Sequence, residues 1–481
     1  MGIWSYISLG ITIIYFLMVA GAVYTVLFER RDPTKAIAWI VVIIILPVVG
    51  MICYIFFGRS FRKRKIFNLK GLKNTRYMEL RSQWQIKNID AIDNENIDPH
   101  IDIVKLLLNN SNTPITFNNS VEILNNGSET FDALFDALKQ ATDHIHLEYY
   151  IIDNDDLGNK LSDILCQKAA AGVEVRLLYD DVGCWSLKKS YLRRLKKAGV
   201  ELRSFMPVVF PYLTSQVNYR NHRKIVVVDG VVGFMGGLNI AQRYLEGNKL
   251  GKWRDTHLKI MGDAVRMLQM TFLTDWYAAS KKELKSSSRF FPKADIIKGG
   301  VATQIALSGP DSDYAVIMQG FFAAISKAKS YIYISTPYFL PGESLLTALK
   351  VAALSGIDVR IMLPARSDMK MAHWASRSYF TELLEANIKV YLYEAGFNHS
   401  KLMVIDGTFG SIGSANMDSR SFEDNFEITA MIYDRALAEQ MRTTYLDDLR
   451  ESTLLTLSGW EGRKRKDNFK EAAARLFTPL L

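Results

Sequence analysis

Two short stretches of the chain carry the same chemically useful residue types at the same spacing. HRKIVVVDG begins with a histidine and a lysine two positions apart and ends, after an apolar run, in aspartate and glycine; HSKLMVIDG repeats this order. The residues concerned are His222, Lys224, Asp229, His399, Lys401 and Asp406. An imidazole with an ordinary pKa of about 6.5 can attack an electrophile or give up a proton at neutral pH. The doubled pattern therefore predicts nucleophilic and acid–base chemistry.

The apolar run in each stretch predicts a β-strand, which sets the direction of each side chain. Alternate residues of a strand project from the same face, so His222 and Lys224 are expected on one face. Asp229 is an odd number of positions from His222 and is expected to face away, toward the interior or a turn. The same parity holds in the second copy. We therefore expect both aspartates to brace the site rather than meet the substrate.

Small residues and an asparagine follow each Asp-Gly pair, in GGLN and in GSAN. Gly237 and Ser414 are expected to leave room for an anionic group. The amides of Asn239 and Asn416, with the serine hydroxyl, can donate hydrogen bonds to its oxygens. These four positions are therefore predicted to bind substrate.

A carboxylate follows each copy at a corresponding place, Asp255 in WRDTHLKI and Glu427 in DNFEITAMI. A carboxylate that accepts a ring N–H fixes the tautomer and the orientation of a histidine. We therefore predict that these two residues support the catalytic histidines.

The assembled groups suit a phosphodiester. One neutral histidine attacks phosphorus and forms a covalent phosphoenzyme, and the other, protonated, gives its proton to the leaving oxygen. Lys224 and Lys401 neutralise charge on the non-bridging oxygens. This chemistry requires no metal and no cofactor. His144, His146 and Glu148 alternate on one strand face, but their counterparts later in the chain are poor ligands, which favours a packed or pocket-lining role.

An internal repeat positions these groups. DHIHLEYYI corresponds to SYIYISTPYFL, and AAAGVEVRLLYD corresponds to AALSGIDVRIML. Strand-like runs alternate with helical patterns in both halves, which predicts an α/β fold of two repeated α/β/α lobes related by pseudo-twofold symmetry. The doubled motif would then form one site. The predicted domains are a transmembrane helical hairpin at 1–60, which is argued below, a juxtamembrane connector at 61–113, a first lobe at 114–290 and a second lobe at 291–481.

The N-terminus carries two long uncharged runs, which predict membrane spans at about 3–27 and 36–57. The basic residues of 59–65 favour a cytoplasmic location for the end of this hairpin. The sequence thus predicts a multi-pass protein of the cell membrane whose catalytic lobes lie on the cytoplasmic side. The apolar, proline-containing segment 205–213 is interpreted either as a loop that dips into the membrane or as a buried connector.

Composition excludes a disordered chain and indicates the sign of the partner. The 481 residues are 49% hydrophobic and 23% charged, and 59 Lys and Arg against 50 Asp and Glu give a net charge of +9. This excess favours anionic partners, either lipid or nucleic acid.

HxKxxxxDG followed by GGxN or GSxN, in two copies, resembles the phospholipase D superfamily. With the apolar N-terminal hairpin, the chain resembles the bacterial cardiolipin synthases over essentially its whole length. The resemblance implies transfer of a phosphatidyl group from one phosphatidylglycerol to another through a phosphohistidine, with release of glycerol and with cardiolipin as product. It carries catalytic roles onto the six motif residues and favours His222 as the nucleophile, although either histidine could chemically fill either role.

Two other enzymes use the same chemistry. With water as acceptor, the chain would be a membrane-bound phospholipase D; with nucleic acid as substrate, it would be a membrane-tethered nuclease. Mixed charges such as NIDAIDNENIDPHID, and the lack of a long basic groove in the sequence, argue against a nucleic-acid partner. A non-catalytic scaffold would predict a damaged motif copy, and both copies are intact.

Overall fold

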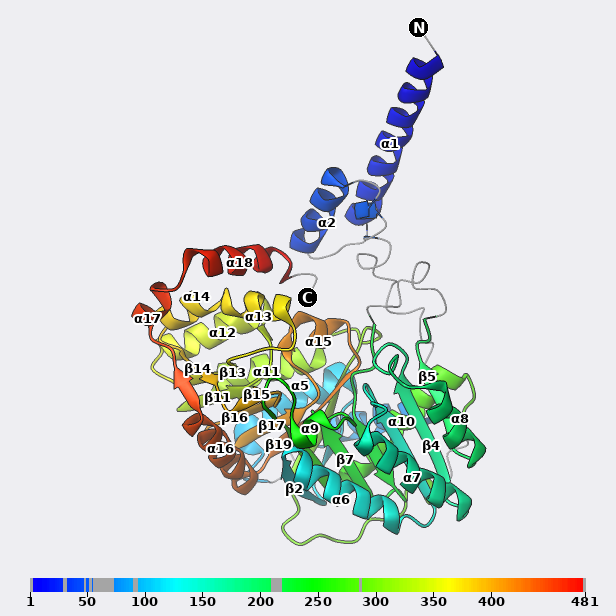
Figure 1. The fold of residues 1–481 in the computed structure, drawn as a ribbon. Helices are drawn as coiled ribbons and strands as arrows, with labels where there is room; N and C mark the ends of the chain where they lie inside the picture. Colours follow the sequence, from blue (N-terminus) through cyan, green and yellow to red (C-terminus); the bar gives the residue numbers. More distant parts are fainter. Residues whose placement is uncertain are drawn as a thin grey trace. The chain divides into compact units, whose positions relative to one another are not determined.

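The computed structural model describes residues 3–28, 33–46, 49–51, 54, 73–89, 94–208, 219–284 and 288–478. The chain divides into two compact units. Met1–Ile66, Val208–Asn218 and Leu480 form the first, and Phe67–Pro207, Tyr219–Pro479 and Leu481 form the second. Figure 1 shows the ribbon of the chain coloured along the sequence.

The first unit contains two apolar helices, α1 (Ile3–Phe28) and α2 (Pro33–Ile45). Pro33 suits the first position of α2, because its ring presets a helical φ and no intrahelical N–H is lost there. Among the described residues, no helix combines the length and the apolar character that crossing a membrane requires. Part of the segment 36–57 and all of the basic cluster 59–65 lie outside the described residues, as do residues 209–213 of the apolar segment. The hairpin and the membrane-dipping loop stay predictions.

The second unit contains two large sheets. The first sheet has seven strands in the order β2-β9-β7-β6-β3-β4-β5. Their bounds are β2 (Asn119–Asn125), β9 (Thr256–Gly262), β7 (Val232–Gly236), β6 (Ile225–Val228), β3 (His144–Tyr149), β4 (Glu174–Asp180) and β5 (Glu201–Phe205). Strands β3, β4 and β5 run parallel, and the other neighbouring pairs are antiparallel.

The second sheet has nine strands in the order β1-β10-β19-β17-β16-β11-β13-β14-β20. Their bounds are β1 (Ile115–Thr116), β10 (Ala302–Ser308), β19 (Glu427–Tyr433), β17 (Phe409–Gly413), β16 (Leu402–Ile405), β11 (Tyr331–Ser335), β13 (Asp358–Pro364), β14 (Lys389–Tyr393) and β20 (Ser452–Leu454). The seven strands from β10 to β14 repeat the order and the directions of the first sheet. This agrees with the predicted α/β fold of two repeated lobes.

The strands divide their side chains between separate cores, because successive residues of a strand point to opposite faces. In β6, Ile225 and Val227 enter the core that both lobes share, whereas Val226 and Val228 enter the outer core of the first lobe. β19 follows the same rule, so both its faces are buried. The two sheets are therefore joined by a continuous apolar layer.

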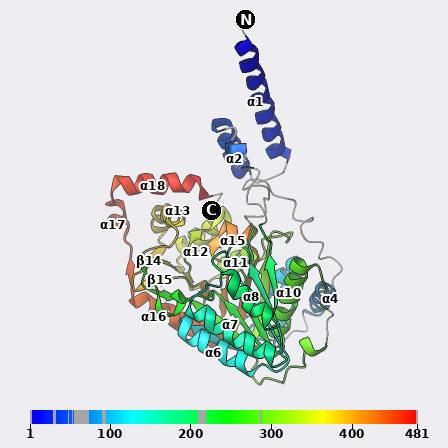
Figure 2. The ribbon, with the colours of Figure 1, turned by 45° about the vertical axis from the view of Figure 1, so that its right-hand side comes forward.

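Helices cover both sheets. The outer core of the first lobe is covered by α6 (Asn126–Gln140), α7 (Asp156–Ala170) and α8 (Lys189–Lys197). The outer core of the second lobe includes residues of α11 (Val316–Lys327), α12 (Gly342–Leu354), α13 (Lys370–Arg377) and α14 (Phe380–Glu385). Two long helices, α10 (Asp263–Ser280) and α16 (Arg435–Arg450), supply residues to the shared layer. Figure 2 shows α6 and α7 side by side.

Shorter elements complete the second unit. They are α9 (Arg243–Glu246), α15 (Ser419–Glu423), α17 (Leu457–Glu461), α18 (Arg465–Leu476), the 3-10 turns Asp98–His100 and Ser288–Phe290, and the short strands β8 (Lys252–Arg254), β12 (Phe339–Leu340), β15 (Gly396–Asn398) and β18 (Met417–Asp418).

The segment interpreted as a connector, 61–113, contains regular structure that belongs to the second lobe. It includes α4 (Lys73–Lys87) and α5 (Ile101–Ser111), and α5 buries Leu107 and Leu108 in the outer core of that lobe. The following strand, β1, pairs with β10. The sheet of the first lobe therefore begins at β2 rather than at residue 114.

Candidate active site

Two short parallel pairings carry each histidine to the opposite lobe. β15, which leads into the second motif, pairs with β8 of the first lobe, and the N–H of His399 donates to the carbonyl of Arg254 at 2.7 Å. In the same way, Asn221 forms a bridge to Phe426, and the N–H of His222 donates to the Phe426 carbonyl at 3.0 Å. Each histidine therefore lies beside the residue that precedes the opposite lobe's acidic residue.

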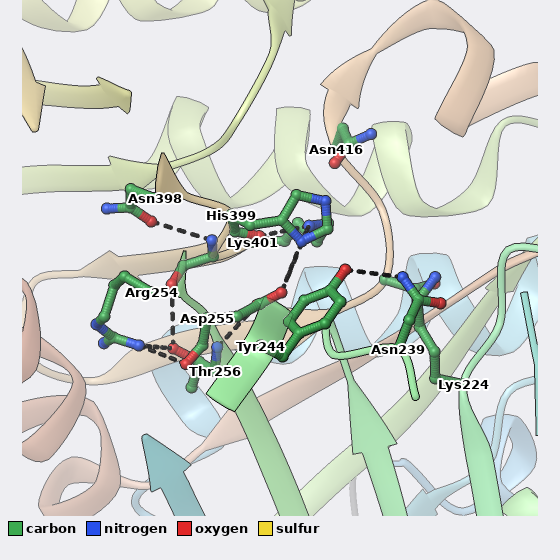
Figure 3. A network of polar contacts seen from close by, with 12 residues as sticks. Lys224, Asn239, Tyr244, Arg254, Asp255, Thr256, Asn398, His399, Lys401 and Asn416 are labelled. Atoms are coloured by element: carbon green, nitrogen blue, oxygen red, sulfur yellow. Dashed lines mark hydrogen bonds and ion pairs between the residues drawn. The ribbon is translucent and has the colours of Figure 1, made fainter. Parts of the chain in front are cut away.

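As a result, each imidazole contacts a carboxylate of the other lobe. Nδ1 of His222 lies 2.9 and 3.1 Å from the two carboxylate oxygens of Glu427. Nδ1 of His399 lies 2.7 Å from Oδ2 of Asp255, as Figure 3 shows. Both carboxylates are fully buried. Because the carboxylates hold Nδ1, Nε2 is the ring atom left to react. The sequence did not indicate that each carboxylate would contact the histidine of the other lobe.

The lysines lie beneath the histidines in buried positions. Nζ of Lys224 donates to the carbonyl of His222 at 2.6 Å, and Nζ of Lys401 lies 2.9 Å from Nδ1 of His399. Burial lowers the pKa of Lys224 to about 7, and it also lowers the pKa of Lys401. An anionic ligand would oppose this shift and favour the charged ammonium.

Burial also keeps both histidines neutral near pH 7. It lowers the pKa of His222 to about 4, an effect that Lys224 strengthens and Glu427 opposes. Burial and Lys401 together lower the pKa of His399 against the opposing pull of Asp255. Burial alone would raise the pKa of Asp255, but the charges of Lys401 and His399 outweigh it and lower the pKa. The carboxylate of Asp255 is therefore ionised at neutral pH.

Gly237 and Ser414 lie against the two buried carboxylates. A Cβ at Gly237 would lie 2.1 Å from Oδ1 of Asp255, so the missing side chain makes room for that carboxylate. The Ser414 hydroxyl is fully buried and donates to Glu427. Gly237 thus accommodates one carboxylate and Ser414 holds the other, and the predicted substrate contacts of the two residues stay predictions. The sequence indicated room for an anionic group at Gly237, and in the structure the carboxylate of Asp255 occupies that room.

The two asparagines differ from each other. Asn239 donates to the Tyr244 hydroxyl at 2.9 Å and accepts from the N–H of Ile151 at 3.1 Å, so its amide is used within the protein. Asn416 has a buried Oδ1 with no hydrogen-bond partner in the described structure, and both asparagines line the cavity. Figure 3 shows the contact between Asn239 and Tyr244. Asn416 is therefore the asparagine whose amide is available to a ligand.

Asp229 and Asp406 lie at the far ends of their strands, away from the histidines. Asp229 and Gly230 both have positive φ, 53° and 69°, and form the tight turn between β6 and β7. The Asp229 carboxylate accepts the N–H groups of Thr142, Asp143 and His144 at 2.7 to 2.9 Å. Asp406 accepts those of residues 329–331 in the same way. This geometry agrees with the parity argument: both carboxylates hold backbone N–H groups away from the histidines, and the catalytic role carried over by resemblance stays a prediction.

The residue before each histidine was missed by the sequence reasoning. Oδ1 of Asn221 accepts the N–H of Arg223 at 3.1 Å, and Oδ1 of Asn398 accepts the N–H of Ser400 at 3.0 Å. Each amide therefore holds the backbone around a histidine. The signal was present in the sequence, because both copies read NHxK.

A cavity of about 460 Å³ contains both histidines in its wall. Other lining residues come from distant parts of the chain, and spacing within the motifs gave no indication of them. They include Tyr150, Arg243, Tyr244, Trp253, Tyr338, Asp368, Met369, Asp418, Arg420 and Asn425. The cavity thus brings together imidazoles, guanidinium groups, carboxylates and aromatic rings that suit a phosphodiester with a polar alcohol group.

His144 and His146 are packed away from this cavity. The ring of His146 stacks on Phe272 with centroids 4.5 Å apart, and both histidines contact Gln269. Glu148 accepts from the Asn221 amide. Within the described ranges, no group of three or more His, Cys, Asp or Glu side chains is arranged to hold a metal ion.

Comparison with known proteins adds the family. A family model described as the PLD-like domain of cardiolipin synthase matches residues 134–252 and 321–449, once in each lobe. A protein named cardiolipin synthase in Alkalihalophilus pseudofirmus is 43% identical over 474 residues, which is 98% of this chain and 94% of the relative. The chain belongs to the cardiolipin synthase family.

A further relative and a second family model agree with this family. A cardiolipin synthase of Oceanobacillus iheyensis is 41% identical over 491 residues and covers 100% of both chains. A second family model, described as phospholipase D-nuclease N-terminal, matches residues 14–59. The resemblance drawn from the doubled motif is confirmed, as is the enzyme class, a phosphatidyltransferase of the cardiolipin synthase type.

A solved structure supports the fold alone. Phosphatidylserine synthase from Haemophilus influenzae Rd KW20 has a TM-score of 0.59, with 15% identity over 79% of this chain and 97% of that chain. This likeness supports the α/β fold, and the family model that matches once in each lobe shows that the two lobes are PLD-like.

Proposed function

We propose that this chain joins two phosphatidylglycerol molecules into cardiolipin and glycerol at one composite site, through a phosphohistidine on His222. The observation that carries the proposal is the pair of carboxylate–histidine contacts across the lobes, Glu427 to His222 and Asp255 to His399, on one cavity. Each histidine has its Nδ1 held and its Nε2 left for chemistry.

In the first half-reaction, neutral His222 attacks the phosphorus of one phosphatidylglycerol. The negative charge of the bound phosphodiester favours the protonated form of His399. The bond from phosphorus to the head-group glycerol oxygen breaks, and protonated His399 gives that oxygen its proton. Glycerol leaves, and a phosphatidyl group stays on His222. The lowered pKa of His222, about 4, supports its role as the nucleophile because only the neutral ring attacks.

In the second half-reaction, His399, now neutral, takes the proton from a head-group hydroxyl of a second phosphatidylglycerol. That oxygen attacks phosphorus, the phosphorus–nitrogen bond breaks, and cardiolipin leaves with both histidines restored. Lys224 and Lys401 stabilise the negative charge that develops on the non-bridging oxygens. Asn416, whose Oδ1 has no hydrogen-bond partner among the described residues, is a further contact for the substrate.

We also propose that the N-terminal runs anchor the enzyme as an integral protein of the cell membrane with the lobes on the cytoplasmic side. The two uncharged runs, the basic cluster at 59–65 and the match of residues 14–59 to the N-terminal family model support this topology. Both substrates and the product are then lipids of the same membrane.

The experiment that tests the reaction uses the full chain in phosphatidylglycerol vesicles without added metal. Lipid products and released glycerol are followed for the parent, His222→Ala and His399→Ala, with His373→Ala, a half-buried histidine outside the cavity wall, as matched control. Cardiolipin with equal glycerol, lost in the first two variants only, is expected. Phosphatidic acid in place of cardiolipin would mean a hydrolase, and cleavage of nucleic acid without lipid products would mean a nuclease.

A second experiment distinguishes the two histidines. With a nitrophenyl phosphodiester, the leaving group needs no proton, so His399→Ala should still form a phosphorylated enzyme that survives alkaline denaturation. His222→Ala should form none. The reverse result would assign the nucleophile to His399.

A further inference from the structure

The C-terminal helix α18 (Arg465–Leu476) exposes an apolar face. Arg465, Phe469, Ala472 and Leu476 recur every three or four positions and therefore share one side of the helix. Phe469 is 75% exposed and Leu476 is 77% exposed, and Phe477 just beyond the helix is also exposed. Large apolar side chains grouped on one helix face mark an interaction surface.

The opposite side of α18 is fixed to the second lobe, so the direction of the apolar face is determined. The buried carboxylate of Glu471 accepts from Nε of Arg377 at 3.2 Å and from Nε of Arg463 at 3.0 Å. The ammonium of Lys470 lies 4.4 Å from the ring centroid of Trp374. Figures 1 and 2 both show α18 next to α13. The helix is therefore held with its apolar side turned outward.

Three consecutive cations, Lys464, Arg465 and Lys466, stand at the start of α18. They are exposed, and their side chains make no hydrogen bond or ion pair with the described parts of the chain. The N-terminus of a helix carries partial positive charge, so cations there oppose the dipole and do not stabilise the fold. Their position beside Phe469 instead gives the face the composition of a helix that lies on an anionic membrane.

The link between α18 and the cavity runs through α13. Asp368 and Met369, just before α13, and Ala372 on it belong to the cavity wall, whereas Trp374 and Arg377 contact α18 or its neighbours. Met369 and Met371 are themselves 46% and 43% exposed. Exposed apolar side chains thus lie both at the rim of the cavity and on α18, which packs against α13.

We propose that α18 is a membrane-docking helix that lies on the anionic phospholipid surface and presents the cavity to lipid head groups. The cations contact lipid phosphates, and Phe469, Ala472 and Leu476 enter the boundary between head groups and acyl chains. A second copy of the chain is a poorer occupant, because the same three cations would face each other. The inference rests on the proposed function only in taking bilayer lipid as the substrate.

Docking is tested directly with the full chain in vesicles of phosphatidylcholine containing one third phosphatidylserine. An environment-sensitive fluorophore is attached to Ala472→Cys, and to Ile296→Cys as matched control, with the labelled parent chain as background for the native cysteines. Ile296 is 90% exposed, and the N–H of the next residue, Ile297, donates to Asn118 just before β2, away from the cavity. Lipids brominated on their acyl chains should quench the label at position 472 and not at 296. Equal quenching at both positions, or none at 472, would overturn the proposal.

Activity then tests the consequence. Phe469→Glu combined with Leu476→Glu is expected to lower kcat/KM on vesicle phosphatidylglycerol by roughly tenfold or more, because two exposed apolar side chains that enter the membrane on docking are replaced by carboxylates. Turnover of dispersed short-chain phosphatidylglycerol should not change. Val231→Glu with Ile296→Glu, two exposed apolar residues remote from the cavity, is the matched control.

The remaining results separate the two proposals. Equal loss on both substrates would show that the variant damages the catalytic lobes and would contradict docking as the cause. If the parent turns over neither lipid, the proposed function fails, and the fluorescence result still decides the docking of α18. Lys464→Gln, Arg465→Gln and Lys466→Gln together should remove the dependence of quenching on phosphatidylserine.

Discussion

Oδ2 of Asp255, in the first lobe, lies 2.7 Å from Nδ1 of His399, in the second lobe. Glu427 of the second lobe contacts His222 of the first in the corresponding way. Neither lobe therefore contains a complete histidine–carboxylate pair. The doubled motif forms one site because each half supplies the acid that orients the other half's base.

Replacement of Asp255 by asparagine should lower kcat by about 10²- to 10⁴-fold, because an amide no longer selects the tautomer with a reactive Nε2. Phosphatidyl transfer and thermal unfolding should be measured together. Asp136→Asn, an exposed change of the same kind, serves as control. If Asp255→Asn kept more than half of the activity, the carboxylate would not orient His399.

Replacement of Gly237 by alanine should disturb the contact between Asp255 and His399, because Gly237 lies against the Asp255 carboxylate. The new Cβ would lie 2.1 Å from Oδ1 of Asp255, so the carboxylate must move away from His399, with an expected loss of about tenfold or more in kcat. A double-mutant cycle checks the cause. Gly237→Ala should cost little extra in a chain that already carries Asp255→Ala; additive losses would show that the glycine acts elsewhere.

The pH profile of kcat/KM reports the groups of the free enzyme. His222, with a pKa of about 4, stays neutral above that pH, whereas Lys224, with a pKa of about 7, loses its charge as the pH rises through neutrality. With a nitrophenyl phosphodiester, which needs no acid, kcat/KM should therefore be high between these values and fall above pH 7. Lys224→Met should show a low profile without that fall, and an unchanged rate up to pH 9 would contradict the role of the lysine.

Replacement of Asp229 by alanine should lower the free energy of unfolding by about 3 kcal/mol, because three backbone N–H groups lose a charged acceptor and alanine disfavours positive φ. Asp229→Asn, which tolerates this φ, should cost less. Chemical unfolding measures both. Activity per folded molecule should remain within a few-fold of the parent; a stable but inactive Asp229→Asn variant would support a catalytic role for this residue.

Some of these relationships could be read directly from local spacing. The apolar run before Asp229 predicted a strand. An odd spacing along that strand predicted that His222 and Asp229 point to opposite faces, and the structure agrees. Asp-Gly required a tight turn with positive φ, and the repeat of the motif required two similar lobes. Each of these inferences depends on neighbours in the chain, and the backbone geometry of a strand or turn fixes such relations within a few residues.

Relations between the lobes could not be read in this way. The sequence indicated two supporting acids but not that Asp255 serves His399 and Glu427 serves His222, because the pairing of β15 with β8 joins residues more than a hundred positions apart. Within the first lobe, Gly237 was assigned to substrate although it accommodates Asp255, because that contact depends on the pairing of β7 with β9, which spacing along the chain does not show.

Local spacing was enough to predict the reactive groups, their direction on each strand and the doubling of the lobe. The pairing of acids with bases, the polar atoms that remain for a ligand and the exposed face of α18 follow from the packing of the folded chain. The reason is physical: periodicity constrains a side chain relative to its own strand or helix, whereas partners across an interface follow from how two sheets pack their apolar faces together.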